Sequence, residues 1–179
     1  MNSDVVERFL RYVKIHTTSS ENSEQFPTTE RQFDLANLLV EEMKEMGISD
    51  ATVNEFCIVT GIIPSNVPKE LPTVGFVAHM DTSPNEPGEN VNPRIIDYQG
   101  GEITFPNPDL RISPEENPEL NLCIGQQIIT SDGTTLLGCD DKGGIAAIMS
   151  LAKNLTTNSS MSHGTVKLMF TPYEEVGKG

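Results

Sequence analysis

Apolar residues recur at helical spacing in three segments of the chain. A first helix, over about residues 4–15, is predicted by the recurrence of Val5, Val6, Phe9, Leu10 and Val13. A second is predicted by an apolar stripe over residues 33–46 that stops at Gly47, and a third by residues 143–155. Asp4 with Glu7 and Thr29 with Gln32 have capping-box spacing, which predicts where the first two helices begin.

Shorter runs of apolar and β-branched residues predict strands. These runs lie at residues 51–56, 57–63, 73–78, 127–130 and 165–170. The runs at 73–78 and 165–170 are almost continuously apolar, which is typical of strands buried on both faces of a sheet. Asp132-Gly133 predicts a tight turn, with residues 135–137 as the return partner of the strand at 127–130.

The order of these elements predicts the fold class. Helices and strands follow one another in a rhythm that indicates an α/β domain with at least partly parallel strands. Residues 82–118 contain seven prolines and few apolar runs, so we expect a Pro-rich excursion at about 82–120, with a small hairpin around 95–105. A chain of 179 residues is long enough for one domain with a sizeable core.

Charge and cysteine content argue against several classes of partner. The formal charge of −14, from 26 acidic and 12 basic residues, disfavours nucleic acid and anionic membranes, because both would be repelled. The three cysteines are odd in number and lack metal-ligand spacing, so a disulfide framework is not expected. We find neither a signal-peptide pattern nor the ~20 apolar residues of a membrane span. A cytoplasmic location is the resulting expectation.

Three short polar motifs carry the candidate chemistry. They are His79-Met80-Asp81, Asp140-Asp141-Lys142-Gly143-Gly144 and Glu174-Glu175, each at the end of a predicted strand or in the loop beyond it. Open α/β sheets bind ligands at such strand ends, so the motifs could converge in space. Each motif alone has an ordinary explanation, such as a capped turn, a helix-dipole contact or an acidic surface. Together, one histidine and three to four carboxylates favour a metal site.

The spacing within the motifs indicates how they could divide the chemistry. Residues two apart in an extended segment project to the same side, so His79 could bind a metal while Asp81 orients the imidazole of His79. A carboxylate at the start of the third helix could bridge two cations. Adjacent glutamates point in different directions, so one could bind metal while the other acts as general base on a metal-bound water, whose pKa falls from about 15.7 to about 7.

Four longer segments resemble one enzyme family. GFVAHMDTSP, NVNPRIIDYQGGEI, TSDGTTLLGCDDKGGIA and FTPYEEVGKG are similar to segments of the peptidase T family, tripeptide aminopeptidases of the zinc superfamily of aminoacylase and carboxypeptidase G. The second segment is typical of peptidase T and not of the superfamily at large. The resemblance implies that residues 1–179 are the N-terminal part of a two-zinc exopeptidase catalytic domain. Its mixed, mostly parallel sheet would be flanked by helices, without the lid and dimerisation domain.

The resemblance also implies a role for each motif residue. His79 would bind one zinc ion, Asp140 would bridge two zinc ions, and Glu175 would bind the second ion. Glu174 would be the general base, and Asp81 would orient His79. Members of the family have a cis peptide bond after the bridging aspartate, which here is the Asp140–Asp141 bond.

The sequence departs from the family pattern in three respects. Tyr173 replaces the usual aspartate and Cys139 the usual alanine, although neither position binds metal in the family. The family also completes its site with an aspartate and a histidine that lie beyond the equivalent of Gly179. His163 precedes its strand and is expected at the opposite edge of the sheet, while His16 has no motif around it. Each zinc ion would keep two protein ligands, where catalytic zinc usually has three.

The function implied by the resemblance is metal-dependent hydrolysis of the N-terminal peptide bond of tripeptides. The complete enzyme would be a longer, homodimeric cytoplasmic protein that acts on small peptides, and the 179 residues alone are expected to be inactive. Two alternatives stay open. The first is a dipeptidase, carboxypeptidase or N-acyl amino acid deacylase of the same superfamily, and the second is a non-catalytic fragment that binds metal weakly.

Overall fold

A computed structural model describes residues 3–177. Its helices and strands are, in chain order, α1 (Asp4–Tyr12), α2 (Gln32–Glu45), β1 (Thr52–Val53), β2 (Val59–Ile63), β3 (Val74–His79), β4 (Arg94–Asp97), β5 (Ile103–Thr104), β6 (Arg111–Ile112), η1 (Pro118–Cys123), β7 (Gln127–Thr130), α3 (Cys139–Thr157), β8 (Val166–Thr171) and η2 (Glu174–Val176), where η marks a 3-10 helix. None of the described helices is long and apolar enough to cross a membrane.

Four of these strands form one mixed sheet, in the order β1-β2-β8-β3. Strand β8 pairs parallel with β3 and antiparallel with β2, and β2 pairs antiparallel with β1. The α/β class is confirmed, but one of these three pairings is parallel, fewer than in the mostly parallel sheet that we expected. The physical reason lies in the connections. Helix α3 carries the chain across between β3 and β8, whereas the short connection between β1 and β2 permits only antiparallel pairing.

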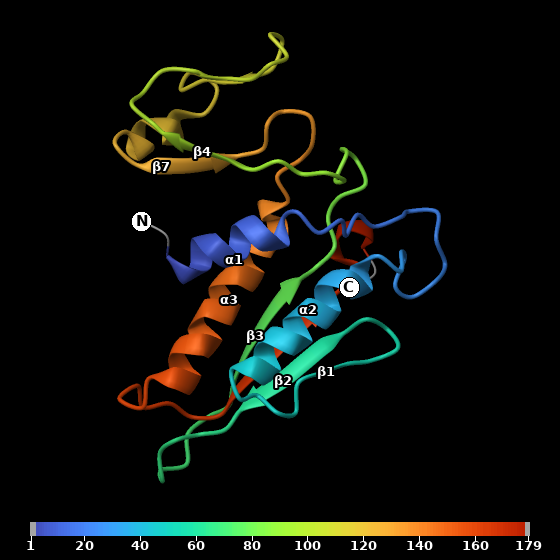
Figure 1. Ribbon diagram of the computed structural model, residues 1–179, viewed down its shortest axis with the longest axis vertical. Helices are drawn as coiled ribbons and strands as arrows, with labels where there is room; N and C mark the ends of the chain where they lie inside the picture. The colour runs from blue at the N-terminus through green and yellow to red at the C-terminus, as the bar shows by residue number, and fades with distance from the viewer. Residues whose placement is uncertain (1–2, 178–179) are drawn as a thin grey trace.

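The three α-helices cover one face of this sheet (Figure 1). Helix α1 packs on α3, while α2 and α3 pack on the strands. Alternate residues of β8 point toward the helices, and three of them, Val166, Leu168 and Phe170, are buried there. The sheet therefore shares one hydrophobic core with the helices and has a fixed register, which in turn fixes where its strands end.

The opposite face of the sheet is open in the described part of the chain. On β3, Val77 is 58% exposed and Val74 is 49% exposed. On β8, Met169 and Lys167 point to the same open face. The expectation that both strands are buried on both faces is therefore wrong. Apolar residues do occupy both faces, but a sequence pattern cannot tell whether a second layer covers them.

The Pro-rich excursion contributes to two small sheets, which lie above the main sheet in Figure 1. Strand β4 pairs with β7, and β5 pairs with β6, both antiparallel. The strand at 127–130 is confirmed, but the hairpin around 95–105 and the return partner at 135–137 are wrong. Asp132 instead accepts hydrogen bonds from the backbone and hydroxyl of Thr134, and the Leu136 N–H then donates to the carbonyl of Pro87. This turn directs the chain toward the excursion and away from β7.

All three predicted helices form, but both capping predictions are wrong. Helix α1 is capped one residue earlier, by the hydroxyl of Ser3. Helix α2 has no side-chain cap among the described residues. The Thr29 hydroxyl donates to the carbonyl of Thr18, and the Gln32 amide donates to Ser19. Thr29 and Gln32 therefore bind the loop that precedes α2 and do not cap the helix.

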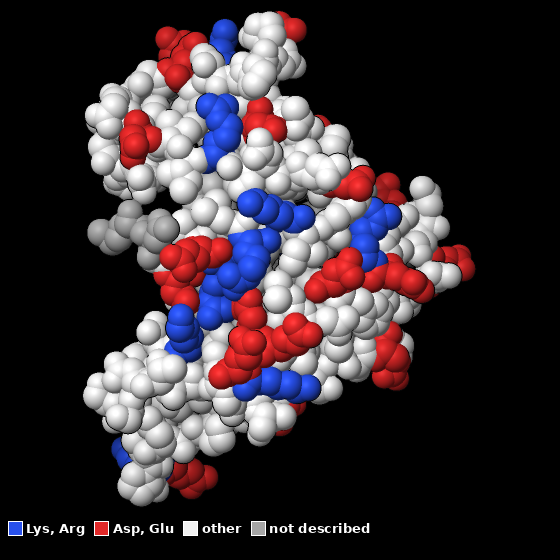
Figure 2. Space-filling view, viewed as in Figure 1, with Lys and Arg blue, Asp and Glu red and all other residues white. Residues whose placement is uncertain are grey.

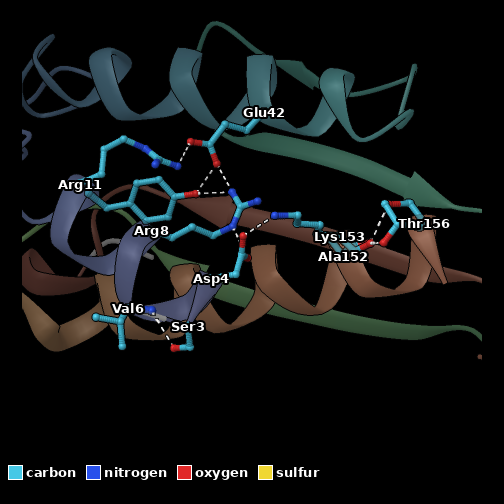
Figure 3. Close-up of polar contacts among 11 residues, drawn as sticks. Ser3, Asp4, Val6, Arg8, Arg11, Glu42, Ala152, Lys153 and Thr156 are labelled. Carbon is cyan, nitrogen blue, oxygen red and sulfur yellow. Dashed lines mark hydrogen bonds and ion pairs between the residues drawn. The ribbon is translucent and has the colours of Figure 1, made fainter. Parts of the chain in front are cut away.

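Charged side chains gather in the middle of the helical face (Figure 2), where a buried network joins α1 to α2 (Figure 3). Glu42 of α2 accepts hydrogen bonds from Arg8 and Arg11 and, at 2.5 Å, from the Tyr12 hydroxyl of α1. Arg8 is 7% exposed and Tyr12 is fully buried. Burial and the carboxylate of Glu42 raise the pKa of Tyr12, so the phenol stays protonated as a donor. The network therefore links the two helices through a desolvated ion pair.

We expect Asp4, at the other end of this network, to contribute stability that acid removes. Burial by itself would raise the pKa of Asp4, but hydrogen bonds from Lys153 and Arg8 outweigh it and lower the pKa from 3.8 to about 2. A carboxyl group with a lower pKa in the folded state stabilises the fold above pH 3.8 and loses this effect as the pH falls through about 2. Asp4→Asn should lower the free energy of unfolding near neutral pH by about 1 kcal/mol at this partly exposed site.

Urea denaturation of both proteins across this pH range measures the effect. The two unfolding free energies should converge as the pH approaches the lowered pKa of Asp4. Glu7→Gln is the matched control, because Glu7 is an exposed carboxylate in the same helical turn. A difference between wild type and Asp4→Asn that does not depend on pH would contradict the prediction.

Candidate metal centre

Two parallel strands deliver their last residues to the same edge of the main sheet. In the register of β3 with β8, His79 lies opposite Thr171. The backbone N–H of Met80 then donates to the carbonyl of Thr171 at 2.7 Å, so the two segments stay paired for one more residue. Asp81 follows β3, and η2, which contains both glutamates, follows β8. The first and third motifs therefore lie side by side, as their positions at strand ends predicted.

Asp81 connects three segments at this edge. Its side chain is fully buried, and Oδ2 accepts hydrogen bonds from the Ser19 hydroxyl at 2.6 Å and the Glu175 N–H at 3.2 Å. Oδ1 accepts the Glu174 N–H at 3.2 Å and lies 3.4 Å from Nδ1 of His79. Burial by itself would raise the pKa of Asp81, but the contacts with His79, Ser19 and the Glu175 N–H outweigh it and lower the pKa. The carboxylate is therefore ionised and held in one orientation.

The imidazole of His79 has one nitrogen toward the protein and one toward the carboxylates. Nδ1 donates to the backbone carbonyl of Asp81 at 3.0 Å, because a carbonyl can only accept. Nε2 lies 2.9 Å from Oδ1 of Asp140 and 3.9 Å from Oε2 of Glu174. Burial alone would lower the pKa of His79, but hydrogen bonds with Asp81 and Asp140 raise it to about 9. With Nδ1 engaged, Nε2 is the ring atom that could bind a metal ion.

The start of α3 directs Asp140 toward this imidazole. Gly138 has a φ of 75°, and the Asp140–Asp141 peptide is cis, as the resemblance implied. The Asp140 side chain is 85% exposed and reaches His79, whereas Asp141 turns back and accepts the Gly144 N–H at 3.1 Å. A Cβ at Gly144 would lie 2.3 Å from Asp141 Oδ1, so a larger residue at this position would displace the Asp141 carboxylate.

The predicted site residues gather in one cluster rich in carboxylates. Ligand-type atoms of His79, Glu174 and Glu175 lie within 4.8 Å of one another, and Asp140 joins them through its contact with His79. Burial raises the pKa of Glu175, the charge of His79 opposes this shift, and the carboxylates of Asp140, Asp81 and Glu174 reinforce it. An excess of carboxylate oxygens around one imidazole suits a divalent cation.

The other two histidines lie away from this cluster. The backbone N–H of His163 donates to the side chain of Asn66, and His163 precedes Val166, at the end of β8 opposite Thr171. The expected position of His163 is therefore confirmed. His16 contacts the guanidinium group of Arg31, with 2.9 Å between Nε2 and Nη1. Neither histidine adds a ligand to the cluster within the described residues.

Comparison with known proteins gives one strong similarity in sequence. The chain is 50% identical, over 99% of its length, to peptidase T of Caldanaerobacter subterraneus, and 48% identical, over 98% of its length, to peptidase T of Halothermothrix orenii. The chain is similar to peptidase T from end to end. It covers 44% and 43% of these two proteins, so it spans less than half the length of the curated relatives that it matches. No protein-family model matches the chain.

Solved structures share the fold at lower identity. The aminopeptidase PepT from Bacillus cereus matches with a TM-score of 0.66 at 21% identity, over 97% of this chain and 37% of that one. An aminoacylhistidine dipeptidase from Vibrio alginolyticus matches with a TM-score of 0.61 at 20% identity, over 97% of this chain and 28% of that one. An M20 family metallo-carboxypeptidase from Sulfolobus solfataricus matches with a TM-score of 0.55 at 20% identity, over 99% of this chain and 32% of that one. The α/β fold expected from the resemblance to peptidase T is confirmed, apart from the mostly parallel pairing.

Two residues near the peptidase T motifs have contacts that the sequence did not indicate. Lys142, which we grouped with the carboxylates, turns away from them. It is buried, and its Nζ donates to the carbonyl of Ile15 at 2.6 Å, while burial lowers its pKa to about 7. Ser19, which donates to Asp81, lies between α1 and α2, outside the three motifs. Its signal in the sequence was a run of four hydroxyl residues at positions 17–20.

Proposed function

We propose that residues 1–179 form the N-terminal part of the catalytic domain of a two-zinc exopeptidase. The complete enzyme would hydrolyse the N-terminal peptide bond of tripeptides. One observation carries this proposal. His79, Asp140, Glu174 and Glu175 converge at one edge of the sheet, in a chain about half of whose residues are identical to those of peptidase T.

In this proposal each residue at the edge of the sheet has one task. Nε2 of His79 would bind one zinc ion, a carboxylate oxygen of Glu175 would bind the other, and Asp140 would bridge the two. Imidazole and carboxylate groups are ordinary zinc ligands. His79 also fits a ligand role because its Nδ1 donates to the Asp81 carbonyl, as the second nitrogen of metal-bound histidines usually does. When bound, the metal polarises the scissile carbonyl and lowers the pKa of the attacking water.

Glu174 would act as the general base. Its side chain is 62% exposed, so the carboxylate is accessible to both water and substrate. Glu174 takes a proton from the water as the water oxygen bonds to the carbonyl carbon. It returns this proton to the peptide nitrogen as the carbon–nitrogen bond breaks, which releases an amino acid and a dipeptide. The Glu174 N–H donates to Asp81, which holds the backbone of the base in place.

Kinetics of the complete enzyme on tripeptides, dipeptides and N-acetyl amino acids tests the substrate class. We expect the highest kcat/KM on tripeptides with a free N-terminus. A preference for N-acetyl amino acids, or removal of the C-terminal residue, would overturn the aminopeptidase assignment. These alternatives are worth testing because the solved structures with this fold include a dipeptidase and a metallo-carboxypeptidase.

We expect the 179-residue chain alone to bind zinc weakly and not to hydrolyse tripeptides. His79, Asp140 and Glu175 would give each of two zinc ions two protein ligands, whereas catalytic zinc sites usually supply three. Calorimetric titration with zinc chloride measures this. Any weak binding should fall in His79→Ala and persist in His163→Ala, because His163 lies at the other end of β8. Tight binding of two zinc ions per chain would refute the prediction.

We also propose a cytoplasmic location and a homodimeric complete enzyme. All three cysteines lie in the described part of the chain and are free thiols, as is usual in a reducing compartment. The homodimer follows from the resemblance to peptidase T alone. Light scattering on the complete enzyme would measure its oligomeric state.

A further inference from the structure

One buried hydroxyl, that of Ser19, reaches the candidate site from outside the three motifs. Ser19 lies in the loop between α1 and α2 and is 4% exposed. Its hydroxyl donates to Oδ2 of Asp81 at 2.6 Å, a shorter contact than the other three of that carboxylate. Its backbone N–H donates to the carbonyl of Thr82 at 3.0 Å. Ser19 is therefore bound both to Asp81 and to the residue that follows it.

Gln32 fixes the direction in which the Ser19 hydroxyl points. Its Nε2 donates to Oγ of Ser19 at 3.2 Å, and the glutamine is fully buried in the first turn of α2. An amide N–H can only donate, so the Ser19 oxygen accepts from Gln32 and its own proton is directed to Asp81. Gln32 at the start of α2 and Ser19 in the preceding loop thus form a directed chain of hydrogen bonds that ends on the Asp81 carboxylate.

The Asp81 carboxylate transmits this constraint to the site. Its oxygens accept the backbone N–H groups of Glu174 and Glu175, and Oδ1 faces Nδ1 of His79. A rotation of the carboxylate would break its contacts with the proposed base and with two proposed metal ligands together. The Ser19 hydroxyl donates to Oδ2, the same oxygen that accepts the Glu175 N–H, and is therefore placed to resist that rotation.

We propose that Ser19 is a positioning residue for hydrolysis and acts through Asp81 on Glu174, Glu175 and His79. This inference rests on the proposed function of the site. Without the hydroxyl, a fully buried carboxylate would lack one of its donors, which is costly unless the carboxylate reorients or water enters. Either response would displace the backbone of the two glutamates.

A comparison of Ser19→Ala with Ser20→Ala in the complete enzyme tests the proposal. Ser20 is the next residue in the same loop, and its backbone N–H donates to the Thr28 hydroxyl. Among the described residues, the polar contacts of the Asp81 carboxylate are with Ser19, Glu174, Glu175 and His79, and not with Ser20. Ser19→Ala should lower kcat by about 10- to 100-fold, the range typical of groups that orient metal-binding side chains, with little change in KM. Ser20→Ala should stay near wild type. Ser19→Thr keeps the hydroxyl and should retain more activity than Ser19→Ala.

Amide hydrogen exchange on the 179-residue chain gives a second readout, which does not depend on activity. The Glu174 and Glu175 N–H groups donate to Asp81, so their exchange should accelerate in Ser19→Ala but not in Ser20→Ala. The Met80 N–H, which donates to Thr171, should keep its protection and show that β3 and β8 remain paired. If the complete enzyme proves inactive on peptides, faster exchange at these two amides still supports the positioning role. Unchanged exchange there, or unchanged kcat in an active enzyme, would overturn it.

Discussion

Replacement of Glu174 by glutamine in the complete enzyme is expected to lower kcat by about 10²- to 10⁴-fold, the usual contribution of a general base. Glutamine has nearly the size and shape of glutamate, but its amide cannot take a proton from water. The contact of Glu174 with Asp81 is made by the backbone N–H, so the substitution leaves that contact in place. Because the side chain is 62% exposed, we expect little effect on folding.

Glu175→Gln is the matched comparison on the neighbouring residue. Its backbone N–H also donates to Asp81, so the two variants differ only in which carboxylate is lost. We expect Glu175→Gln to weaken metal affinity, measured by competition with a chelator, while Glu174→Gln keeps a metal content near wild type. If Glu174→Gln loses metal and Glu175→Gln does not, the proposed roles of base and ligand must be exchanged. Full activity in Glu174→Gln would contradict the assignment of the base.

The predicted part of the site was accessible from the sequence because its geometry is local. His79 and Asp81 lie at the end of β3, and Glu174 follows β8. The parallel pairing of β3 with β8 brings both strand ends to one edge of the sheet. The alternation of an extended chain then accounts for the shared side of His79 and Asp81. The start of α3, with its glycines and paired aspartates, is likewise one short segment.

The parts that the sequence did not predict depend on contacts between distant residues. Ser19 and Asp81 are 62 positions apart, and no local pattern links them. Thr29 and Gln32 have capping-box spacing, but their side chains bind the preceding loop, because tertiary contacts outweigh a cap of about 1 kcal/mol. Strand pairing likewise depends on distant segments, since β4 pairs with β7 and not with β5, its neighbour in the sequence.

Glu42 is a second case in which a local pattern misleads. A glutamate in an amphipathic helix is usually exposed, and Glu41 and Glu45 on the same helix are exposed. Glu42 is 8% exposed, however, because Arg8 and Tyr12 of α1 approach it in the space between the helices. A buried charge of this kind is tolerated only when it is paired and hydrogen-bonded. The network is therefore a point where a small chemical change should have a large effect on stability.

Glu42→Gln is expected to lower the free energy of unfolding by about 3 kcal/mol, near the lower end of the cost of breaking a buried ion pair. The substitution keeps the shape of the side chain and an acceptor for the Tyr12 hydroxyl, but leaves the buried guanidinium of Arg8 without one of its two carboxylates. The lower end of the range applies because Arg8 keeps Asp4, and because the side chain of Arg11 is 48% exposed to water. Urea denaturation of the 179-residue chain measures the change.

Glu45→Gln provides the control for Glu42→Gln. It removes the same charge from the same helix at an exposed position, so it should change the unfolding free energy by less than about 0.5 kcal/mol. Equal losses in the two variants would mean that the net charge of the helix matters and the buried network does not. A larger loss in Glu42→Gln that high salt leaves unchanged would instead support the network, since salt screens buried pairs much less than exposed charges. Helix α2 also carries Gln32 at its start, so the network that anchors this helix to α1 also supports the hydrogen bonds that reach Asp81.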